Sequence, residues 1–241
     1  WSKGSDALIF VKSDESKVPE INIPIYGKNL YPKLMTYKYP KAGEVNSTVS
    51  AHLYQLSSGK TLDLNLGSFE NYYIPQVYST AKNDEVALAT SNRHQNKVDI
   101  LKVNTSNGAV SKLISETDNA WIETDGMTLE FLDDNSFLWA SERSGFRHLY
   151  WFDAKGNLKK PVTKGNCEIT DYYGFNPKTK EVFIQTTEKG SLNKVVSKVN
   201  ISNGKMTLLS QAEGNNRADF SKNYQYFIET SSNANKPYVY T

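Results

Sequence analysis

The sequence predicts an all-β protein, and three observations support this. Tyr, Phe and Trp together make up 12% of the 241 residues, and aromatic side chains are enriched in strands. The apolar runs are short and end at glycine-containing turns, as strands do and long helices do not. The third observation is that these strand–turn–strand units recur along the chain at a nearly constant period.

The clearest unit covers residues 135–156. In its segments 136–142 and 148–152, apolar side chains occur at consecutive positions and therefore on both faces of each strand. Both faces of each strand are thus expected to be covered. Ser144-Gly145 provides the turn between them, and the turn at 154–156 ends in a glycine that can adopt positive φ. The unit predicts a piece of stacked antiparallel sheet.

Three features of this unit recur in step. The turn glycines are spaced by 49, 48 and 48 residues, at Gly59, Gly108, Gly156 and Gly204. The strand before each turn begins at Val49, Val98, His148 and Val195. The strand before that begins at Asp6, Asp84, Asn135, Lys180 and Asn223. A further apolar segment leads each unit, at 73–79, 127–132, 168–175 and 217–221.

Four strands per unit at a period near 48 residues predict a β-propeller of four-stranded antiparallel blades. A single blade cannot cover both its faces, so the blades must stack. A β-sandwich is the competing all-β fold, but it gives no reason for a fixed period. The positions of these units along the chain predict one partial propeller domain over 1–241, which forms an open arc of about four and a half blades. The units are expected at 1–66, 72–114, 127–163, 168–210 and 216–241.

An insertion interrupts the first unit at residues 14–48. It holds four of the eight prolines, at 19, 24, 32 and 40. Proline disfavours both central strands and helix interiors, so we expect an extended excursion with short edge strands.

Composition excludes several classes of function. The net charge is +2 and the basic residues are scattered, which argues against a nucleic-acid partner. No apolar run is long enough to insert this segment into a bilayer. The single cysteine, Cys167, is interpreted as a small buried residue, with a reactive thiol as the alternative. The chain starts at Trp1 without a signal peptide, so we expect a piece of a larger protein.

The motifs for hydrolysis and for metal binding are missing. No two glycines have the Gly-x-Ser-x-Gly spacing of a nucleophile elbow, and no histidines have metal-ligand spacing. There is no phosphate loop, and no metal or cofactor is predicted. The three histidines are His52, His94 and His148. Of these, His52 and His148 occupy equivalent positions near the start of the third strands of their units, which favours a structural role for both.

Acidic pairs occur at 14–15, 84–85 and 133–134, each between strands, where solvated carboxylates are common. An acid–base or cation site is the alternative. A glycosidase-type propeller would need converging carboxylates, which this spacing does not supply. The segment 141–148 is dense in polar groups, and we interpret it as a tight blade turn in which Glu142 pairs with Arg143 or Arg147. The alternative is a ligand-binding loop on a propeller face.

Several short motifs, in order, resemble one family. They include Tyr31-Pro32-Lys33, Thr163-Lys164-Gly165 and an opening over 1–20, and the family-motif positions are Tyr39, Pro40, Lys41, Gly43, Asn46, Asn92, Arg93, Gln95, Ser141, Glu142, Arg143, Gly145 and His148. Together they resemble the N-terminal region of dipeptidyl peptidase IV, in the prolyl oligopeptidase-type serine peptidases. The block at 39–43 is the most specific part.

The resemblance implies a propeller of about eight blades that precedes an α/β-hydrolase domain carrying Ser, Asp and His. Members release N-terminal X-Pro or X-Ala dipeptides, and the peptide binds between the two domains. This chain contains neither the triad nor the family's Glu pair, which precedes the segment matching Trp1, so alone it is predicted to be inactive. Its expected role is to shape and gate the peptide-binding cavity. The alternative is a stand-alone propeller that binds a ligand or a protein.

By the same resemblance, residues 121–127 face the substrate-side loops. Glu123, Thr124 and Asp125 are therefore candidate substrate-binding residues, although this segment and Asn166-Cys167 depart from the family pattern. The expected partners are a peptide substrate, the missing hydrolase domain, the remaining blades and a second copy in a homo-oligomer. The family implies a periplasmic, secreted or cell-surface location, and the low cysteine content suggests a bacterial source.

Overall fold

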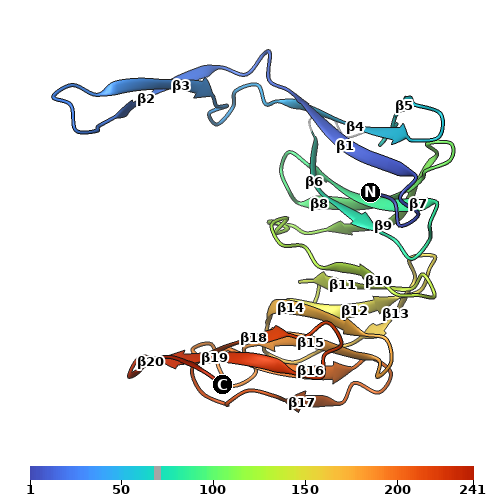
Figure 1. Cartoon of the computed structure of the whole chain (residues 1–241), viewed down its shortest axis with the longest axis vertical. Helices are drawn as coiled ribbons and strands as arrows, with labels where there is room; N and C mark the ends of the chain where they lie inside the picture. Colours follow the sequence, from blue (N-terminus) through green and yellow to red (C-terminus); the bar gives the residue numbers. More distant parts are fainter. Residues whose placement is uncertain (68–71) are drawn as a thin grey trace. The chain divides into compact units, whose positions relative to one another are not determined.

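The computed structural model describes residues 1–67 and 72–241, and its elements are twenty strands with no helix among the described residues. Every pairing between neighbouring strands within the sheets is antiparallel, as the sequence predicts. The chain divides into two compact units, residues 1–125 and 126–241, which we describe separately (Figure 1). No described segment forms an apolar helix long enough to cross a membrane.

Unit 1 contains two stacked sheets. The first is three-stranded, with the order β1 (Ala7–Asp14), β4 (Thr48–Gln55), β5 (Lys60–Asp63). The second is four-stranded, with the order β6 (Tyr72–Ser79), β7 (Glu85–Asn92), β8 (Lys97–Asn104), β9 (Val110–Thr117). Leu53 of the first sheet and Leu88 of the second are both fully buried in one apolar cluster, so the two sheets pack face to face.

The proline-rich insertion forms a separate hairpin of β2 (Glu20–Ile25) and β3 (Lys33–Lys38). These strands pair only with each other, and the hairpin extends away from the sheets of unit 1 (Figure 1). Three of its prolines flank the strands, and Pro24 lies within a two-stranded ribbon, where one edge of each strand is open. We call residues 19–40 the arm.

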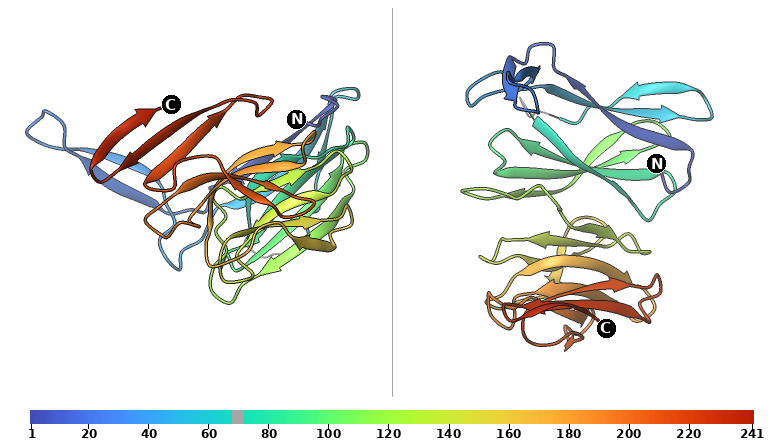
Figure 2. Two further views of the ribbon diagram at one scale, coloured as in Figure 1. Left: turned by 90° about the horizontal axis from the view of Figure 1, so that it is seen from below. Right: turned by 60° about the vertical axis from the view of Figure 1, so that its left-hand side comes forward.

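Unit 2 contains three sheets. The first has the order β10 (Leu129–Phe131), β11 (Phe137–Ser141), β12 (His148–Phe152), β13 (Leu158–Pro161). The second has the order β14 (Ile169–Asn176), β15 (Glu181–Thr186), β16 (Val195–Asn200), β17 (Met206–Leu208). The third is three-stranded, with the order β18 (Asn215–Phe220), β19 (Phe227–Asn233), β20 (Lys236–Tyr240). The first two sheets share an apolar cluster that includes Leu138 and Leu149 from one and Ile184 from the other. The sheets of this unit are layered in both views of Figure 2.

The strands β11 and β12 are buried on both faces, as their sequence predicts. Phe137, Leu138 and Trp139 are consecutive and each is at most 2% exposed. Phe137 stacks on Phe152 of the neighbouring strand, with ring centroids 5.0 Å apart. Because consecutive side chains point to opposite faces of a strand, a sheet with this pattern must be covered on both sides. Stacked four-stranded antiparallel sheets of this kind are propeller blades.

Candidate functional site

The loop between β9 and β10 carries the three candidate substrate-binding residues, and the turn between β7 and β8 holds it in place. The backbone N–H of Ile122 donates to the carbonyl of Gln95 over 2.7 Å. The side-chain amide of Gln95 donates to Thr124 Oγ1 over 3.1 Å. The N–H of Asp118 donates to the carbonyl of Asn96 over 2.9 Å. These bonds connect the motif at 92–96 to the loop some thirty residues further along the chain.

Two exposed carboxylates lie at the end of this loop. Glu123 Oε1 accepts a hydrogen bond from the backbone N–H of Asp125 over 3.0 Å, which closes a local turn. Glu123 and Asp125 are exposed, whereas Thr124 is half-buried against Gln95. Trp121 of the same loop is 50% exposed. The loop thus presents one large aromatic ring and two acidic groups to solvent, and their substrate-binding role stays a prediction.

The turn at 92–96 also contacts the segment that returns from the arm to β4. Asn92 stabilises the turn itself, because its Oδ1 accepts from the backbone N–H groups of Asn96 and Lys97, each over 3.1 Å. Arg93 Nη2 donates to the carbonyl of Glu44 over 2.8 Å. Two of the family motifs, 39–46 and 92–96, therefore meet in the fold.

The motif at 39–46 itself forms the return from the arm to β4. The N–H of Tyr39 donates to the carbonyl of Pro19 over 2.9 Å, which closes the base of the arm. The N–H of Glu44 donates to the carbonyl of Lys41 over 2.9 Å in a turn where Gly43 has a φ of 84°. Pro40 and Asn46 are half-buried beside this turn.

The turn at 141–148 is held by its arginines. Arg143 Nε donates to Ser141 Oγ over 2.9 Å, and its guanidinium lies 4.9 Å from the centre of the Tyr150 ring. Arg147 Nη2 donates to the carbonyl of Gly126 over 3.0 Å, so this turn contacts the end of the 121–127 loop within unit 2. Gly145 has a φ of 92°, a conformation that glycine adopts without steric cost. Glu142 is exposed.

His148 is buried and hydrogen-bonded at both ring nitrogens. Its Nε2 lies 3.0 Å from the carbonyl oxygen of Gly165, which can only accept, so Nε2 carries the proton. Nδ1 therefore accepts from the hydroxyl of Thr163 over 3.0 Å. The Thr163 oxygen in turn accepts from the N–H of Leu149 over 3.0 Å. This network ties β12 to the segment between β13 and β14, and it contains no carboxylate.

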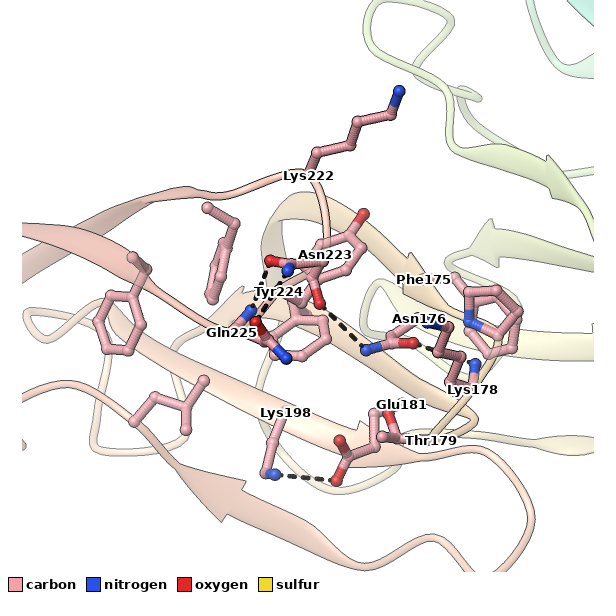
Figure 3. Close-up of a pocket in the computed structure, with 15 residues that line it drawn as sticks. Phe175, Asn176, Lys178, Thr179, Glu181, Lys198, Lys222, Asn223, Tyr224 and Gln225 are labelled. Atoms are coloured by element: carbon pink, nitrogen blue, oxygen red, sulfur yellow. Dashed lines mark hydrogen bonds and ion pairs between the residues drawn. The ribbon is translucent and has the colours of Figure 1, made fainter.

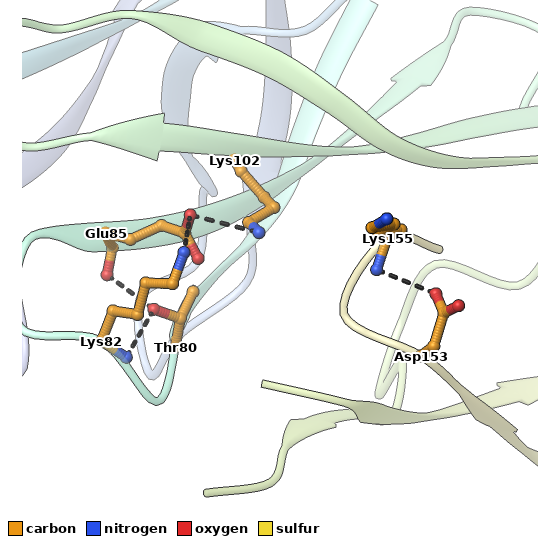
Figure 4. Close-up of polar contacts among 6 residues, drawn as sticks. All are labelled: Thr80, Lys82, Glu85, Lys102, Asp153 and Lys155. Carbon is orange, nitrogen blue, oxygen red and sulfur yellow. Dashed lines mark hydrogen bonds and ion pairs between the residues drawn. The ribbon is translucent and has the colours of Figure 1, made fainter. Parts of the chain in front are cut away.

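One member of each acidic pair, and Asp153 in a further turn, has a structural partner in the fold. Glu85 Oε2 forms ion pairs with Lys82 Nζ at 3.4 Å and with Lys102 Nζ at 3.2 Å (Figure 4). Asp153 accepts from the N–H of Lys155 in the turn after β12 (Figure 4). The hydrogen bond from Ser136 lowers the pKa of Asp134, and the bond from Ser16 lowers the pKa of Asp14. No group of three His, Cys, Asp or Glu side chains with metal-binding geometry occurs in the described part of the chain.

Cys167 is half-buried, and burial raises the pKa of its thiol. A raised pKa leaves less of the reactive thiolate at neutral pH. These features favour the small structural residue over the reactive thiol.

A cavity of about 1120 Å³ lies in unit 2 beside β15, β16 and the turn between β18 and β19 (Figure 3). Its wall includes the stacked rings of Phe183 and Tyr224, whose centroids are 4.6 Å apart. Its one carboxylate, Glu181, pairs with Lys198 at 3.0 Å. None of the predicted substrate-binding residues lines this cavity.

Comparison with known proteins identifies the family. The model of the dipeptidyl peptidase IV N-terminal region matches residues 1–238. The chain belongs to this family. The resemblance found from the motifs is therefore confirmed, with nearly the whole chain included in the match.

Two solved structures share this fold. The crystal structure of Porphyromonas gingivalis dipeptidyl peptidase 4 matches all of this chain, and 34% of its own length, with a TM-score of 0.92 and 37% identity. A putative dipeptidyl aminopeptidase IV from Bacteroides ovatus matches all of this chain, and 37% of its own, with a TM-score of 0.84 and 26% identity. Both are bacterial, and the prediction of a β-propeller with four-stranded antiparallel blades is confirmed.

Curated relatives extend the family to eukaryotes. Dipeptidyl peptidase 4 of Arthroderma otae is 26% identical over 99% of this chain and 32% of its own length. Inactive dipeptidyl peptidase 10 of Rattus norvegicus is 29% identical over 78% of this chain and 25% of its own. The chain thus spans about a third of the length of the relatives it matches, and it is part of the N-terminal propeller region of a dipeptidyl peptidase IV-like protein.

Proposed function

We propose that this propeller shapes and gates the peptide-binding cavity of a serine exopeptidase that releases N-terminal X-Pro or X-Ala dipeptides. The observation that carries the proposal is the 121–125 loop, which Gln95 holds through two hydrogen bonds and which presents Trp121, Glu123 and Asp125 to solvent. An exposed ring and two carboxylates suit an extended peptide that offers cationic side chains and backbone N–H donors. The chemistry itself belongs to a hydrolase domain with which this propeller would assemble.

The test uses the full-length protein with an X-Pro chromogenic dipeptide substrate and with longer X-Pro peptides. Glu123→Gln with Asp125→Asn should raise KM for the longer peptides with little change in kcat, because these residues would bind peptide away from the reacting bond. Glu142→Gln is the matched control, because it neutralises an exposed carboxylate in another turn. An unchanged KM for every peptide would show that Glu123 and Asp125 do not bind the substrate.

The second proposal for the whole chain is a stand-alone binding module. The reading frame beyond Thr241 discriminates between the two, since a Gly-x-Ser-x-Gly motif there supports the peptidase and a stop codon supports the module. The purified 241-residue chain should not turn over an X-Pro substrate, and turnover would contradict the non-catalytic role. The family resemblance also supports a periplasmic, secreted or cell-surface location, which fractionation of the source cells would test.

The arm supports a further proposal, that the protein is a homo-oligomer. Large apolar side chains cover the hairpin and its tip without packing on a sheet, and Leu30, Tyr26, Tyr31 and Leu34 are 88%, 78%, 77% and 68% exposed. An apolar surface of this kind is typical of an interaction site. Sedimentation should show a dimer or larger species, and Leu30→Glu with Leu34→Glu should shift it to the monomer. Tyr238→Glu, at an exposed position outside the arm, is the control. A wild-type monomer at all concentrations would contradict the proposal.

A further inference from the structure

Gln95 occupies an unfavourable backbone conformation in the turn between β7 and β8. Its φ is 51°, in the left-handed region that residues with long side chains seldom adopt. Its N–H closes the turn by donating to the carbonyl of Asn92 over 2.9 Å. A strained residue of this kind persists only where the surrounding contacts stabilise it, so the contacts of Gln95 are informative.

The equivalent turns of two later sheets have glycine at this position. Between β11 and β12, the N–H of Gly145 donates to the carbonyl of Glu142 over 2.8 Å, and the φ of Gly145 is 92°. Between β15 and β16, the N–H of Gly190 donates to the carbonyl of Thr187 over 2.9 Å, and the φ of Gly190 is 100°. A Cβ at Gly145 would meet nothing within 4 Å, so glycine serves the backbone conformation alone. The turn itself therefore needs no side chain at this position.

The side chain of Gln95 makes a contact that glycine could not make. Its Nε2 donates to Thr124 Oγ1 over 3.1 Å, while its backbone carbonyl accepts from the N–H of Ile122 over 2.7 Å. Glycine at this position would keep the second bond and lose the first. The loop that receives both bonds joins β9 to β10, so the sheets before and after it both belong to this chain.

The two bonds determine which side chains of the loop face outward. Burial alternates along 121–125, where Ile122 and Thr124 are half-buried and the three odd-numbered residues are exposed. Successive side chains of an extended backbone point in opposite directions, so a shift by one residue would exchange the two sets. Because Gln95 binds Ile122 through its carbonyl and Thr124 through its side chain, it keeps the even-numbered set inward.

We propose that Gln95 is a positioning residue for peptide binding, and that it keeps the loop in the conformation that presents Trp121, Glu123 and Asp125. The inference rests on the proposed function of this loop and adds a residue that does not contact the substrate itself. It also assigns a role to Thr124, which is the partner of Gln95 and not a contact of the peptide. The strain at Gln95 is what the fold accepts in order to keep a side chain where glycine would suffice.

Gln95→Gly in the full-length protein separates positioning from stability. Glycine relieves the left-handed strain and keeps the bond to Ile122, so the midpoint of thermal unfolding should equal or exceed that of the wild type. Loss of the side-chain hydrogen bond should raise KM for the longer X-Pro peptides about threefold to tenfold, with little change in kcat. A purely structural residue would instead lower the midpoint. Gln95→Glu should restore most of the KM, because its carboxylate can accept from the hydroxyl of Thr124.

Amide hydrogen exchange gives a readout that does not depend on activity. Exchange at 121–126 should be about threefold to tenfold faster in Gln95→Gly than in the wild type, with unchanged exchange in β7 and β8. Arg93→Ala is the control from the same turn, since the bond of Arg93 goes to the carbonyl of Glu44 and not to the loop. Arg93→Ala should leave both the exchange at 121–126 and the KM unchanged.

Thr124→Val tests whether the effect comes from this hydrogen bond. Valine has the shape of threonine without the hydroxyl acceptor, so Thr124→Val should raise KM as much as Gln95→Gly does, and the double variant should raise it no further. Fully additive effects would mean that Thr124 contacts the peptide independently, and would overturn the proposal. Unchanged exchange at 121–126 in Gln95→Gly would also overturn it.

The same measurements distinguish failure of this inference from failure of the proposed function. If Glu123→Gln with Asp125→Asn raises KM and Gln95→Gly does not, the loop binds peptide without this positioning residue, and only the inference fails. If neither change raises KM, the loop does not bind peptide, and both fail. A raised KM in both, with an undiminished thermal midpoint in Gln95→Gly, is the result expected here.

Discussion

The phenolic oxygen of Tyr172 on β14 donates a hydrogen bond to the carboxylate of Glu130 on β10, and so connects the first strands of two neighbouring sheets in unit 2. Burial raises the pKa of Glu130, and the bond from Tyr172 opposes that rise in part. The pKa of Tyr172 is raised well above its ordinary value by burial and by the nearby carboxylate. The pair is a polar connection between two apolar sheet faces.

Replacing Tyr172 with Phe should destabilise the protein by about 1–3 kcal/mol, because the Glu130 carboxylate then stays partly buried without its donor. Urea unfolding followed by Trp fluorescence gives the free energy of unfolding. Tyr226→Phe is the control, since that side chain is 76% exposed and should change stability by less than about 0.5 kcal/mol. Equal effects of the two substitutions would show that the bond contributes nothing.

The raised pKa of Glu130 also predicts how stability depends on pH. A carboxyl group whose pKa is higher in the folded protein stabilises fully below its ordinary value of 4.5, and this contribution is lost as the pH rises through the raised value. Glu130→Gln cannot ionise, so it should lose less stability than the wild type as the pH rises from 4 to 7. Tyr172 and Tyr224, whose pKa values are also raised by burial, stay neutral in this range. Parallel curves for the two proteins would contradict this prediction.

The fold was predictable from the sequence because each blade repeats the same physical requirement. The strands at 136–142 and 148–152 are apolar on both faces, and only stacked sheets satisfy such strands. The arm was harder to predict. Its prolines indicate an extended excursion. The pairing of Ile21 with Tyr37 could not be predicted, because the sequence between the two strands has no motif of a tight hairpin turn.

The candidate site was only partly predictable, since it depends on contacts between segments far apart in sequence. The sequence indicated 92–96 as part of a family motif, but not that Gln95 would hold Thr124 or that Arg93 would reach Glu44. The equivalence of His52 and His148 was visible in the repeat. Their different partners were not, because Asp63 lies on a neighbouring strand and Thr163 in the segment after β13, and only the folded sheets define which of them reaches each ring.

The two equivalent histidines should differ in their effect on stability. His148→Leu leaves the buried hydroxyl of Thr163 without its partner and removes the donor to the carbonyl of Gly165, which should cost about 2–4 kcal/mol. His52→Leu leaves partners that water can reach, because Asp63 is 91% exposed, and should cost less than about 1 kcal/mol. Urea unfolding of both variants compares them. A larger loss for His52→Leu would contradict the contrast.

The base of the arm should loosen when Arg93 is replaced. Arg93→Ala removes the bond to the carbonyl of Glu44, while the closing bond between Tyr39 and Pro19 remains. We expect faster amide hydrogen exchange at 41–47 and earlier tryptic cleavage after Lys41, with a stability loss of only about 1 kcal/mol. Arg217→Ala, an exposed arginine of β18, controls for the loss of charge. Unchanged exchange at 41–47 would show that the turn at 92–96 does not restrain the arm.

Two glycines with similar backbone angles should respond differently to alanine. Gly214 has a φ of 85°, and a Cβ there would lie 2.4 Å from the carbonyl oxygen of Ser232, a backbone atom that cannot move aside without shifting β19. Gly204 has a φ of 74°, and a Cβ there would meet nothing within 4 Å. Gly204→Ala should therefore cost about 1–2 kcal/mol for the left-handed conformation alone. Gly214→Ala should cost a further 1–3 kcal/mol or so for the steric overlap, since the paired strands β18 and β19 must separate locally. Thermal unfolding of the two variants measures the difference, and equal midpoints would show that the chain around Gly214 relaxes freely.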